Sequence, residues 1–159
     1  MKYWLIKSEG SCYSIADLQK DGTTAWTGVR NYQARNFMRD EMKVGDLVLF
    51  YHSNGDTEAP AGIYGIAKVS GLAHADMTAF DPKDEHYDAR AAELNVDGKA
   101  PVWVCADVAF MRAFDKPVSL AEIKLDPKLS GMLVAKRGQR LSVMPVSEKH
   151  FRRIKELRP

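Results

Sequence analysis

The sequence of 159 residues is poor in cysteine and has no long apolar segment. Its two cysteines, Cys12 and Cys105, stand 93 positions apart, which excludes a disulfide framework and the paired-cysteine spacing of a zinc site. Near the start, only residues 3–6 separate Lys2 from Lys7, and four residues are too few for a signal peptide or a membrane span. We therefore expect no membrane partner and a cytoplasmic location, or a nuclear one in a eukaryote.

The signatures of nucleotide and metal binding are also absent. The sequence contains neither Gly-x-x-x-x-Gly-Lys-Ser/Thr nor Gly-x-Gly-x-x-Gly, the patterns in which glycines let the backbone approach phosphates. The four histidines lack ligand spacing, and the acidic segment Asp76–Asp97 lacks the alternating oxygen ligands of a calcium loop. His52 and Ser53 are neighbours on a predicted strand, so their side chains point to opposite faces and make a poor catalytic dyad. We expect no cofactor and no required metal.

The net charge is only +2, but positive charge is concentrated at one end of the chain. Residues 1–131 carry 15 basic and 19 acidic side chains, a net of −4, whereas residues 132–159 carry 8 basic and 2 acidic ones, a net of +6. Such a block is either a solvated helix face or a phosphate-binding surface. Its members are Lys136, Arg137, Arg140, Lys149, Arg152, Arg153, Lys155 and Arg158.

At 45% hydrophobic and 28% charged residues, the composition is that of a globular protein, and we expect residues 1–159 to form a single domain. Residue patterns predict strands at Tyr3–Lys7, Leu47–Tyr51, Gly62–Val69, Val102–Phe114, Gly131–Ala135 and Leu141–Val146. Capping residues predict helices at Ser14–Lys20, after Asn31, at Ser119–Ile123 and from Ser147 to Leu157, with a helical turn at Ala89–Leu94. Without regular βαβ alternation, this order favours an α+β fold around a small, mainly antiparallel and partly closed barrel.

Trp26 stands out because it precedes a polar and basic turn, Thr27 to Asn31. Strand and helix periodicity do not account for an indole here, whereas Trp4 and Trp103 are expected to fill the core. An indole face beside hydroxyl, amide and guanidinium groups suits a planar polar heterocycle. Stacking contributes about 1–3 kcal/mol per base, and hydrogen bonds read the base edge. The turn therefore indicates a base-binding site.

Four blocks of the sequence, in this order and spacing, resemble the EVE domain, a member of the PUA-like superfamily that also contains the YTH and ASC-1 homology domains. The blocks are Tyr3–Glu9, Trp26–Asn36, Gly45–Ser53 and Arg140–Val146. The resemblance runs nearly end to end and implies a PUA-like pseudo-barrel of mainly antiparallel strands with short flanking helices. It also implies a non-catalytic module whose pocket takes up a flipped, modified nucleobase. Modified cytosine or adenine in DNA is the expected ligand, and modified RNA is the alternative partner.

The resemblance also assigns roles to residues. Lys7 and Ser8 match a Lys-Ser pair of the YTH domain, Glu9 follows at a position that contacts the base edge, and Trp26 matches the first cage tryptophan. Since a carboxylate only accepts hydrogen bonds, Glu9 would favour an exocyclic amino group such as cytosine N4 or adenine N6. His74 stands where the family usually has a tyrosine that could form the second wall. The predicted base-binding residues are Lys7, Ser8, Glu9, Trp26, Thr27, Asn31, Tyr51, His52, Ser53 and His74, and the predicted phosphate-binding residues are Arg30, Arg35, Lys136, Arg137 and Arg140.

Two other functions stay open. Because ASC-1 homology relatives include amidohydrolases of modified nucleosides, the resemblance also implies a hydrolase in which Lys7 and Glu9 form a general-base pair, if burial lowers the pKa of the lysine. A plain ion pair at a strand end is the structural explanation of the same two residues. The acidic segment Asp76–Asp97 could instead serve as a protein-interaction surface.

Overall fold

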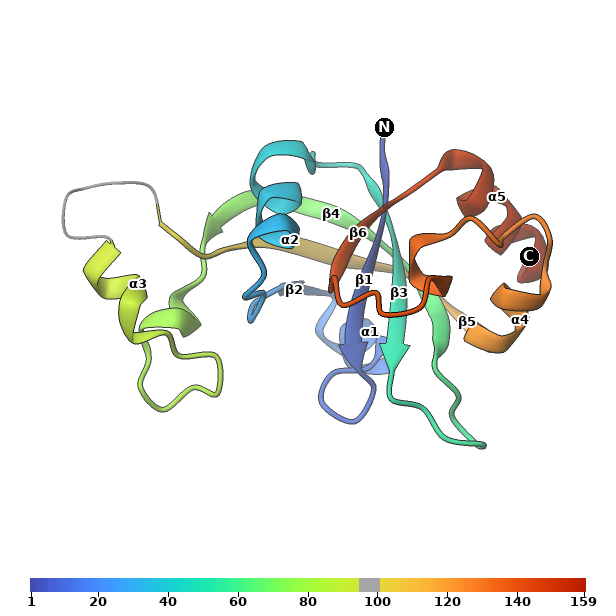
Figure 1. Ribbon diagram of the computed structural model, residues 1–159, viewed down its shortest axis with the longest axis horizontal. Helices are drawn as coiled ribbons and strands as arrows, with labels where there is room; N and C mark the ends of the chain where they lie inside the picture. Colours follow the sequence, from blue (N-terminus) through green and yellow to red (C-terminus); the bar gives the residue numbers. More distant parts are fainter. Residues whose placement is uncertain (95–100) are drawn as a thin grey trace.

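The computed structural model of the protein describes residues 1–94 and 101–159 and places their strands in one six-stranded sheet (Figure 1). In space the strands follow the order β2, β5, β4, β3, β1, β6. Strands β1 and β3 run parallel, and the other neighbouring pairs are antiparallel. The predicted α+β class with mainly antiparallel strands is confirmed. The strands are β1 (Tyr3–Glu9), β2 (Thr23–Ala25), β3 (Leu47–Ser53), β4 (Gly62–Ala75), β5 (Val104–Ser119) and β6 (Val143–Val146).

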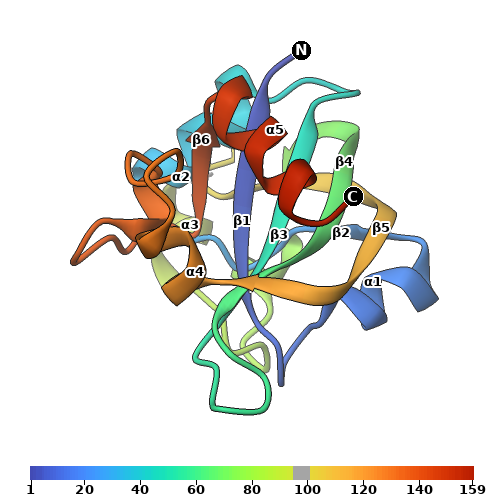
Figure 2. The same cartoon turned by 90° about the vertical axis from the view of Figure 1, so that its right-hand side faces the viewer.

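The sheet curls because its two longest strands bend (Figure 2). Strands β4, with 14 residues, and β5, with 16, pair through several register shifts, and such bulges increase the local twist. At Gly65 a β-carbon would lie 2.3 Å from the carbonyl oxygen of Arg112, so this close approach of the two strands requires glycine. Within the described residues, β2 and β6 are the two ends of the sheet and do not pair with each other. The barrel is therefore open, as a pseudo-barrel is.

In the described residues, five short helices flank the sheet: α1 (Ile15–Asp21), α2 (Tyr32–Asn36), α3 (Ala89–Leu94), α4 (Leu120–Leu125) and α5 (Glu148–Leu157). The predicted caps are present, since the side chains of Ser14, Asn31, Ser119 and Ser147 each accept a hydrogen bond from a backbone N–H of the first turn. Helix α2 continues into a π-helical turn, η1 (Phe37–Glu41). None of the helices formed by the described residues combines the length and the hydrophobicity that a membrane crossing needs.

Several details differ from the sequence prediction. The strand predicted at Gly131–Ala135 is wrong, because residues Leu133–Ala135 form a 3-10 turn, η3, in which Lys136 N donates to Leu133 O; a short apolar run does not by itself distinguish the two states. Strand β2 was not predicted, and β5 continues past Phe114 to Ser119. The acidic segment forms a 3-10 turn, η2 (Met77–Phe80), and then α3 as predicted, while its last residues lie outside the described part of the chain.

Buried groups fix the strand ends that carry the site. Trp4 and Phe50 are fully buried in the main core between sheet and helices. The carboxylate of Asp46 accepts hydrogen bonds from Lys2 N and Trp4 Nε1, each at 2.9 Å. Burial alone would raise the pKa of Asp46, but these bonds hold it below its ordinary value. This contact ties the start of β1 to the start of β3, so their distal ends emerge side by side.

A second, smaller cluster of buried side chains stabilises the segment between β4 and β5. It consists of Ala79, Ala91 and Trp103, with Phe80 and Val102 packed against it. Trp103 is 4% exposed, which confirms it as a core residue, although in this separate cluster. Figure 1 shows this segment, with α3, projecting from one end of the sheet.

Candidate functional site

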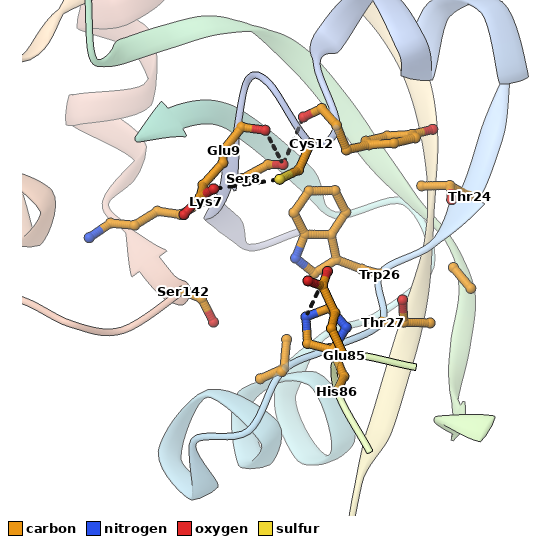
Figure 3. Close-up of a pocket in the computed structure, with 14 residues that line it drawn as sticks. Lys7, Ser8, Glu9, Cys12, Thr24, Trp26, Thr27, Glu85, His86 and Ser142 are labelled. Carbon is orange, nitrogen blue, oxygen red and sulfur yellow. Dashed lines mark hydrogen bonds and ion pairs between the residues drawn. The ribbon is translucent and has the colours of Figure 1, made fainter. Parts of the chain in front are cut away.

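A cavity of about 490 Å³ opens where β1 and β2 end (Figure 3), within the size range of small-molecule sites, about 300–1,000 Å³. The end of β1 and its following loop, β2 and its following turn, residues 85–86 and Ser142 surround it. Five of the ten predicted base-binding residues line it together: Lys7, Ser8, Glu9, Trp26 and Thr27. The other lining residues are Cys12, Tyr13, Thr24, Ala25, Gly28, Val29, Glu85, His86 and Ser142.

The indole of Trp26 is a fixed apolar wall of this cavity. Its backbone N–H donates to Ala106 O at 2.8 Å, which holds the residue after β2 against β5. The ring meets Phe50 edge to face at 5.4 Å between centroids and Tyr13 at 6.3 Å. Only 8% of Trp26 is exposed. An aromatic ring packed in this way is held in a fixed position, and the part of it that lines the cavity offers an apolar surface to a ligand.

The end of β1 supplies a cation to the cavity. The ammonium of Lys7 donates to the carbonyl oxygen of Gln139 at 3.3 Å and lies 6.0 Å from the centroid of the Tyr51 ring. Burial lowers the pKa of Lys7. In the described part of the chain no carboxylate lies within ion-pair distance of Lys7, so the structure does not contain the Lys7–Glu9 ion pair that the sequence allowed. Its remaining N–H donors are available to a ligand.

Glu9 supplies an acceptor at the same end of β1. Asn54 Nδ2 donates to one carboxylate oxygen at 3.1 Å, and the Cys12 thiol donates to the other at 3.5 Å. This hydrogen bond from the thiol, with a smaller contribution from desolvation, raises the pKa of Cys12. The Ser8 hydroxyl donates to Tyr13 O at 2.7 Å, which holds the loop after β1. The carboxylate is therefore oriented while keeping lone pairs for an incoming N–H.

Opposite these residues, Glu85 and His86 form a wall that a buried ion pair holds in place. Asp76, fully buried, accepts from the guanidinium of Arg30 at 2.8 Å and from Gly28 N at 2.8 Å. Arg30 Nε also donates to His86 O at 2.9 Å. Burial alone would raise the pKa of Asp76, but hydrogen bonds from Thr78, Arg30 and Gly28 lower it. The turn after Trp26 is thereby joined to the segment that carries His86.

The other predicted base-binding residues do not line the cavity. Asn31 caps α2 by accepting from Ala34 N at 3.0 Å. Tyr51 lies 3% exposed beneath Lys7, and Ser53 Oγ donates to Ser8 O at 3.3 Å. His52 accepts from Ile15 N at 3.1 Å and stacks on Tyr64 with centroids 3.9 Å apart. These contacts support the strands beneath the cavity.

His74 lies elsewhere, so the second wall comes from residues that the sequence did not indicate. Its Nε2 is 2.8 Å from a carboxylate oxygen of Asp107, which raises the pKa of His74, and its partner in the sheet is Cys105. Glu85 and His86, which do line the cavity, belong to the acidic segment, where nothing in the local pattern marks them. Ser142 lies in Arg140–Val146, one of the four blocks that carry the family resemblance, so the sequence did contain a signal for this residue.

The predicted phosphate-binding residues fall into two groups. The first group already donates hydrogen bonds within the protein: Arg30 to Asp76 and His86 O, and Arg35 to Val102 O at 2.9 Å and to Asn36 Oδ1. Lys136, Arg137 and Arg140 are exposed on the segment that reaches the cavity through Gln139 and Ser142. Three further cations of the basic block, on or just after α5, are paired with carboxylates: Arg152 with Glu148, Arg153 with Asp126 and Arg158 with Glu122.

Comparisons with known proteins agree with this architecture. The chicken protein "Thymocyte nuclear protein 1" is 42% identical over 168 residues, covering 94% of this chain and 65% of the relative; the chain thus spans just under two thirds of that protein's length. A crystal structure of a Pseudomonas syringae protein superposes with a TM-score of 0.89, 40% identity and 99% coverage of both chains. The crystal structure of human THYN1 in complex with 5-methylcytosine-containing DNA superposes with a TM-score of 0.86 and 36% identity, covering 99% of this chain and 97% of that one.

The match to a family is equally extensive. The sequence profile of the EVE domain covers residues 2–157, which includes every residue that lines the cavity. Both the fold and the sequence lead to one conclusion: the chain belongs to the EVE domain family.

Proposed function

We propose that this protein binds a modified nucleobase extruded from a DNA strand, with modified cytosine as the preferred ligand. The observation that carries the proposal is the cavity at Trp26, in which a fixed indole face stands beside an oriented carboxylate and a half-buried ammonium. That human THYN1, 36% identical over 99% of this chain, was crystallised with 5-methylcytosine-containing DNA supports modified DNA as the ligand.

The polar rim suits the edge of cytosine. In the proposed complex the base stacks on Trp26, and Glu9 accepts from the exocyclic N4 amino group. Lys7, with no carboxylate partner among the described residues, donates to an acceptor atom of the base or to its phosphate. A buried or half-buried cation is costly without such a partner, so its position favours a ligand rich in acceptors.

The exposed cations beside the cavity would bind the flanking phosphates. We assign this role to Lys136, Arg137 and Arg140, whose segment contacts Lys7. Arg30 and Arg35 are left out of the proposed contacts because their guanidinium groups already donate to acceptors within the protein. With few phosphate contacts, affinity should depend strongly on the base and only moderately on salt.

The experiment is calorimetric titration with DNA oligonucleotides that differ only in one base: cytosine, 5-methylcytosine or another modified base. RNA of the same sequence tests the alternative partner. Trp26→Leu keeps an apolar side chain but removes the π-face, so affinity should fall about 5- to 150-fold, the equivalent of 1–3 kcal/mol of stacking. Trp26→Phe should retain part of the affinity, and Tyr87→Leu, outside the cavity, all of it. Uniform, salt-sensitive binding that is indifferent to the modification and to Trp26 would contradict the proposal.

A hydrolase acting on modified nucleosides is the second candidate, because burial lowers the pKa of Lys7, which is the direction of shift that a lysine general base needs. Incubation with acetylated or otherwise modified cytidines, followed by chromatography, tests it. Turnover that Lys7→Met abolishes would favour the enzyme; binding without turnover would favour the reader. The location, cytoplasm or nucleus, stays a prediction.

A further inference from the structure

An exposed aromatic side chain, Tyr32, follows the cavity-lining turn after Trp26 along the chain. Tyr32, the first residue of α2, stacks on Trp103 with ring centroids 5.0 Å apart and an angle of 26° between the rings. Trp103 is 4% exposed, yet Tyr32 is 54% exposed. One face of the tyrosine therefore covers the buried indole, while a large part of the residue faces solvent.

The position of Arg35 leaves the outer face of this tyrosine open. Its guanidinium carbon lies 4.8 Å from the Tyr32 centroid and 5.9 Å from the Trp103 centroid. If the guanidinium covered the outer face, it would be about as far from Trp103 as the sum of the two spacings, 5.0 and 4.8 Å. The much shorter 5.9 Å shows that the guanidinium does not lie on the side of Tyr32 opposite Trp103. The guanidinium, which donates to Val102 O and Asn36 Oδ1, therefore does not cover the free face of Tyr32.

The stacked pair is held rigidly. Trp103 Nε1 donates to a carboxylate oxygen of Asp88 at 2.8 Å, and the indole packs in the small cluster with Ala79 and Ala91. Arg35 Nη1 donates to Val102 O at 2.9 Å, which fixes α2 to the residue before Trp103. An exposed aromatic ring that is immobilised from below loses little conformational entropy when a second ring stacks on it.

Tyr32, the exposed member of the stacked pair, is close to the base cavity along the chain. Val29 lines the cavity, and Tyr32 follows three residues later, so their Cα atoms lie at most about 11 Å apart. Figure 1 shows the connection after β2 leading directly into α2. A nucleotide adjoining the one in the cavity would reach the tyrosine without a long detour of the strand.

We propose that Tyr32 is a second nucleobase site, on which the base next to the extruded one stacks. This inference rests on the proposed function, and it extends it from one base to two. The protein would then bind a modified base together with one adjoining base. The adjoining position would accept any base, because every base has a π-face.

The test compares a ligand of one base with a ligand of three. The wild type, Tyr32→Leu and Tyr32→Phe are titrated with the nucleoside 5-methyldeoxycytidine and with trinucleotides that carry the same base in the centre. Leucine still covers Trp103 but has no π-face, so Tyr32→Leu should bind the trinucleotide about tenfold more weakly and the nucleoside unchanged. Tyr32→Phe should bind both like the wild type.

Trinucleotides with an abasic residue on the 5′ or the 3′ side identify the neighbour. On the side that stacks, removing the base should weaken wild-type binding about tenfold and should have no further effect on Tyr32→Leu. Equal trinucleotide binding by wild type and Tyr32→Leu would overturn the second site while leaving the first intact. Loss of nucleoside binding in Tyr32→Leu would show that the residue acts only by supporting the cavity, and failure of the wild type to bind either ligand would remove both proposals.

Discussion

The imidazole of His86 packs directly over the α-carbon of Gly28. A β-carbon at Gly28 would lie 2.7 Å from His86 Nε2 and 2.8 Å from two carbons of the same ring. Gly28 also has a φ of +82°, a backbone conformation that is strained for residues with a side chain. Gly28 is therefore required for two separate reasons: its positive φ, and the lack of space for a β-carbon beside His86, which belongs to the cavity wall.

Gly28→Ala should consequently weaken the binding of a modified base, because it displaces His86 from the cavity wall. We expect an affinity loss of about tenfold, within the range for a misplaced contact group, and a loss of about 1–3 kcal/mol in the free energy of unfolding from the strained backbone. Calorimetry and urea unfolding measure the two effects.

Gly22→Ala is the matched control for this substitution. Gly22 has a φ of +78°, but a β-carbon added there would meet no atom within 4 Å, so alanine should cost similar stability and leave the affinity unchanged. If both variants bind like the wild type, the contact between Gly28 and His86 does not shape the site.

Two arginines that look alike in the sequence should behave differently. Arg140 is exposed beside the cavity, so Arg140→Gln should leave stability within about 0.5 kcal/mol and reduce the slope of log affinity against log salt by about 1. Arg30 donates to buried Asp76, so Arg30→Gln should cost about 3 kcal/mol of stability. A salt titration and urea unfolding of both variants distinguish the roles. A reduced salt slope with unchanged stability in Arg30→Gln would restore it as a phosphate ligand.

Glu9 should select an amino edge over a carbonyl edge. 5-Methylcytosine and thymine, placed at the same position of one oligonucleotide, share the 5-methyl group but present different edges: an N4 amino donor beside an N3 acceptor in one, and an O4 acceptor beside an N3–H donor in the other. The wild type should prefer 5-methylcytosine by about tenfold or more, since a good base-edge contact contributes about 1–3 kcal/mol to discrimination. Glutamine presents both an acceptor and a donor, so Glu9→Gln should lose most of this preference. Glu58→Gln, an exposed loop variant, should keep it; an unchanged ratio in Glu9→Gln would exclude base-edge reading by Glu9.

The sequence was sufficient to find those cavity residues that follow one another in the chain. The family resemblance indicated Lys7 to Glu9, and the tryptophan before a polar turn indicated Trp26 and Thr27; both groups line the cavity. Most elements of the fold also followed from caps and strand patterns, because those signals are local. The hairpin of β3 and β4 and the helix at Ser147 were found in this way.

Residues that reach the cavity through tertiary contacts could not be found in the same way. His86 is placed by the hydrogen bond of its carbonyl with Arg30, 56 positions away, and the ion pair of Arg30 with Asp76 spans 46 positions. A basic residue in a polar turn is compatible with a phosphate ligand or with an internal ion pair until its partner is known. For the same reason, His74 was an understandable candidate for the second wall, although its side chain is directed to Asp107 on the neighbouring strand.

Asp76 should give the protein a specific sensitivity to acid. Its folded pKa lies below the ordinary value of 3.8, so its contribution to stability is present above that value and is lost as pH falls through the lower folded pKa. At pH 7, Asp76→Asn should therefore be about 3 kcal/mol less stable than the wild type, because Arg30 loses its buried partner. The difference should narrow as the pH falls below about 4, where Asp76 takes up a proton in the unfolded chain while the folded protein still holds it ionised. Urea unfolding followed by tryptophan fluorescence at pH 7, 5, 4 and 3 measures this difference in the free energy of unfolding. The exposed Asp115→Asn is the control and should be as stable as the wild type at each pH. A difference between Asp76→Asn and the wild type that stays constant from pH 7 to pH 3 would show that the charge of Asp76 does not stabilise the fold.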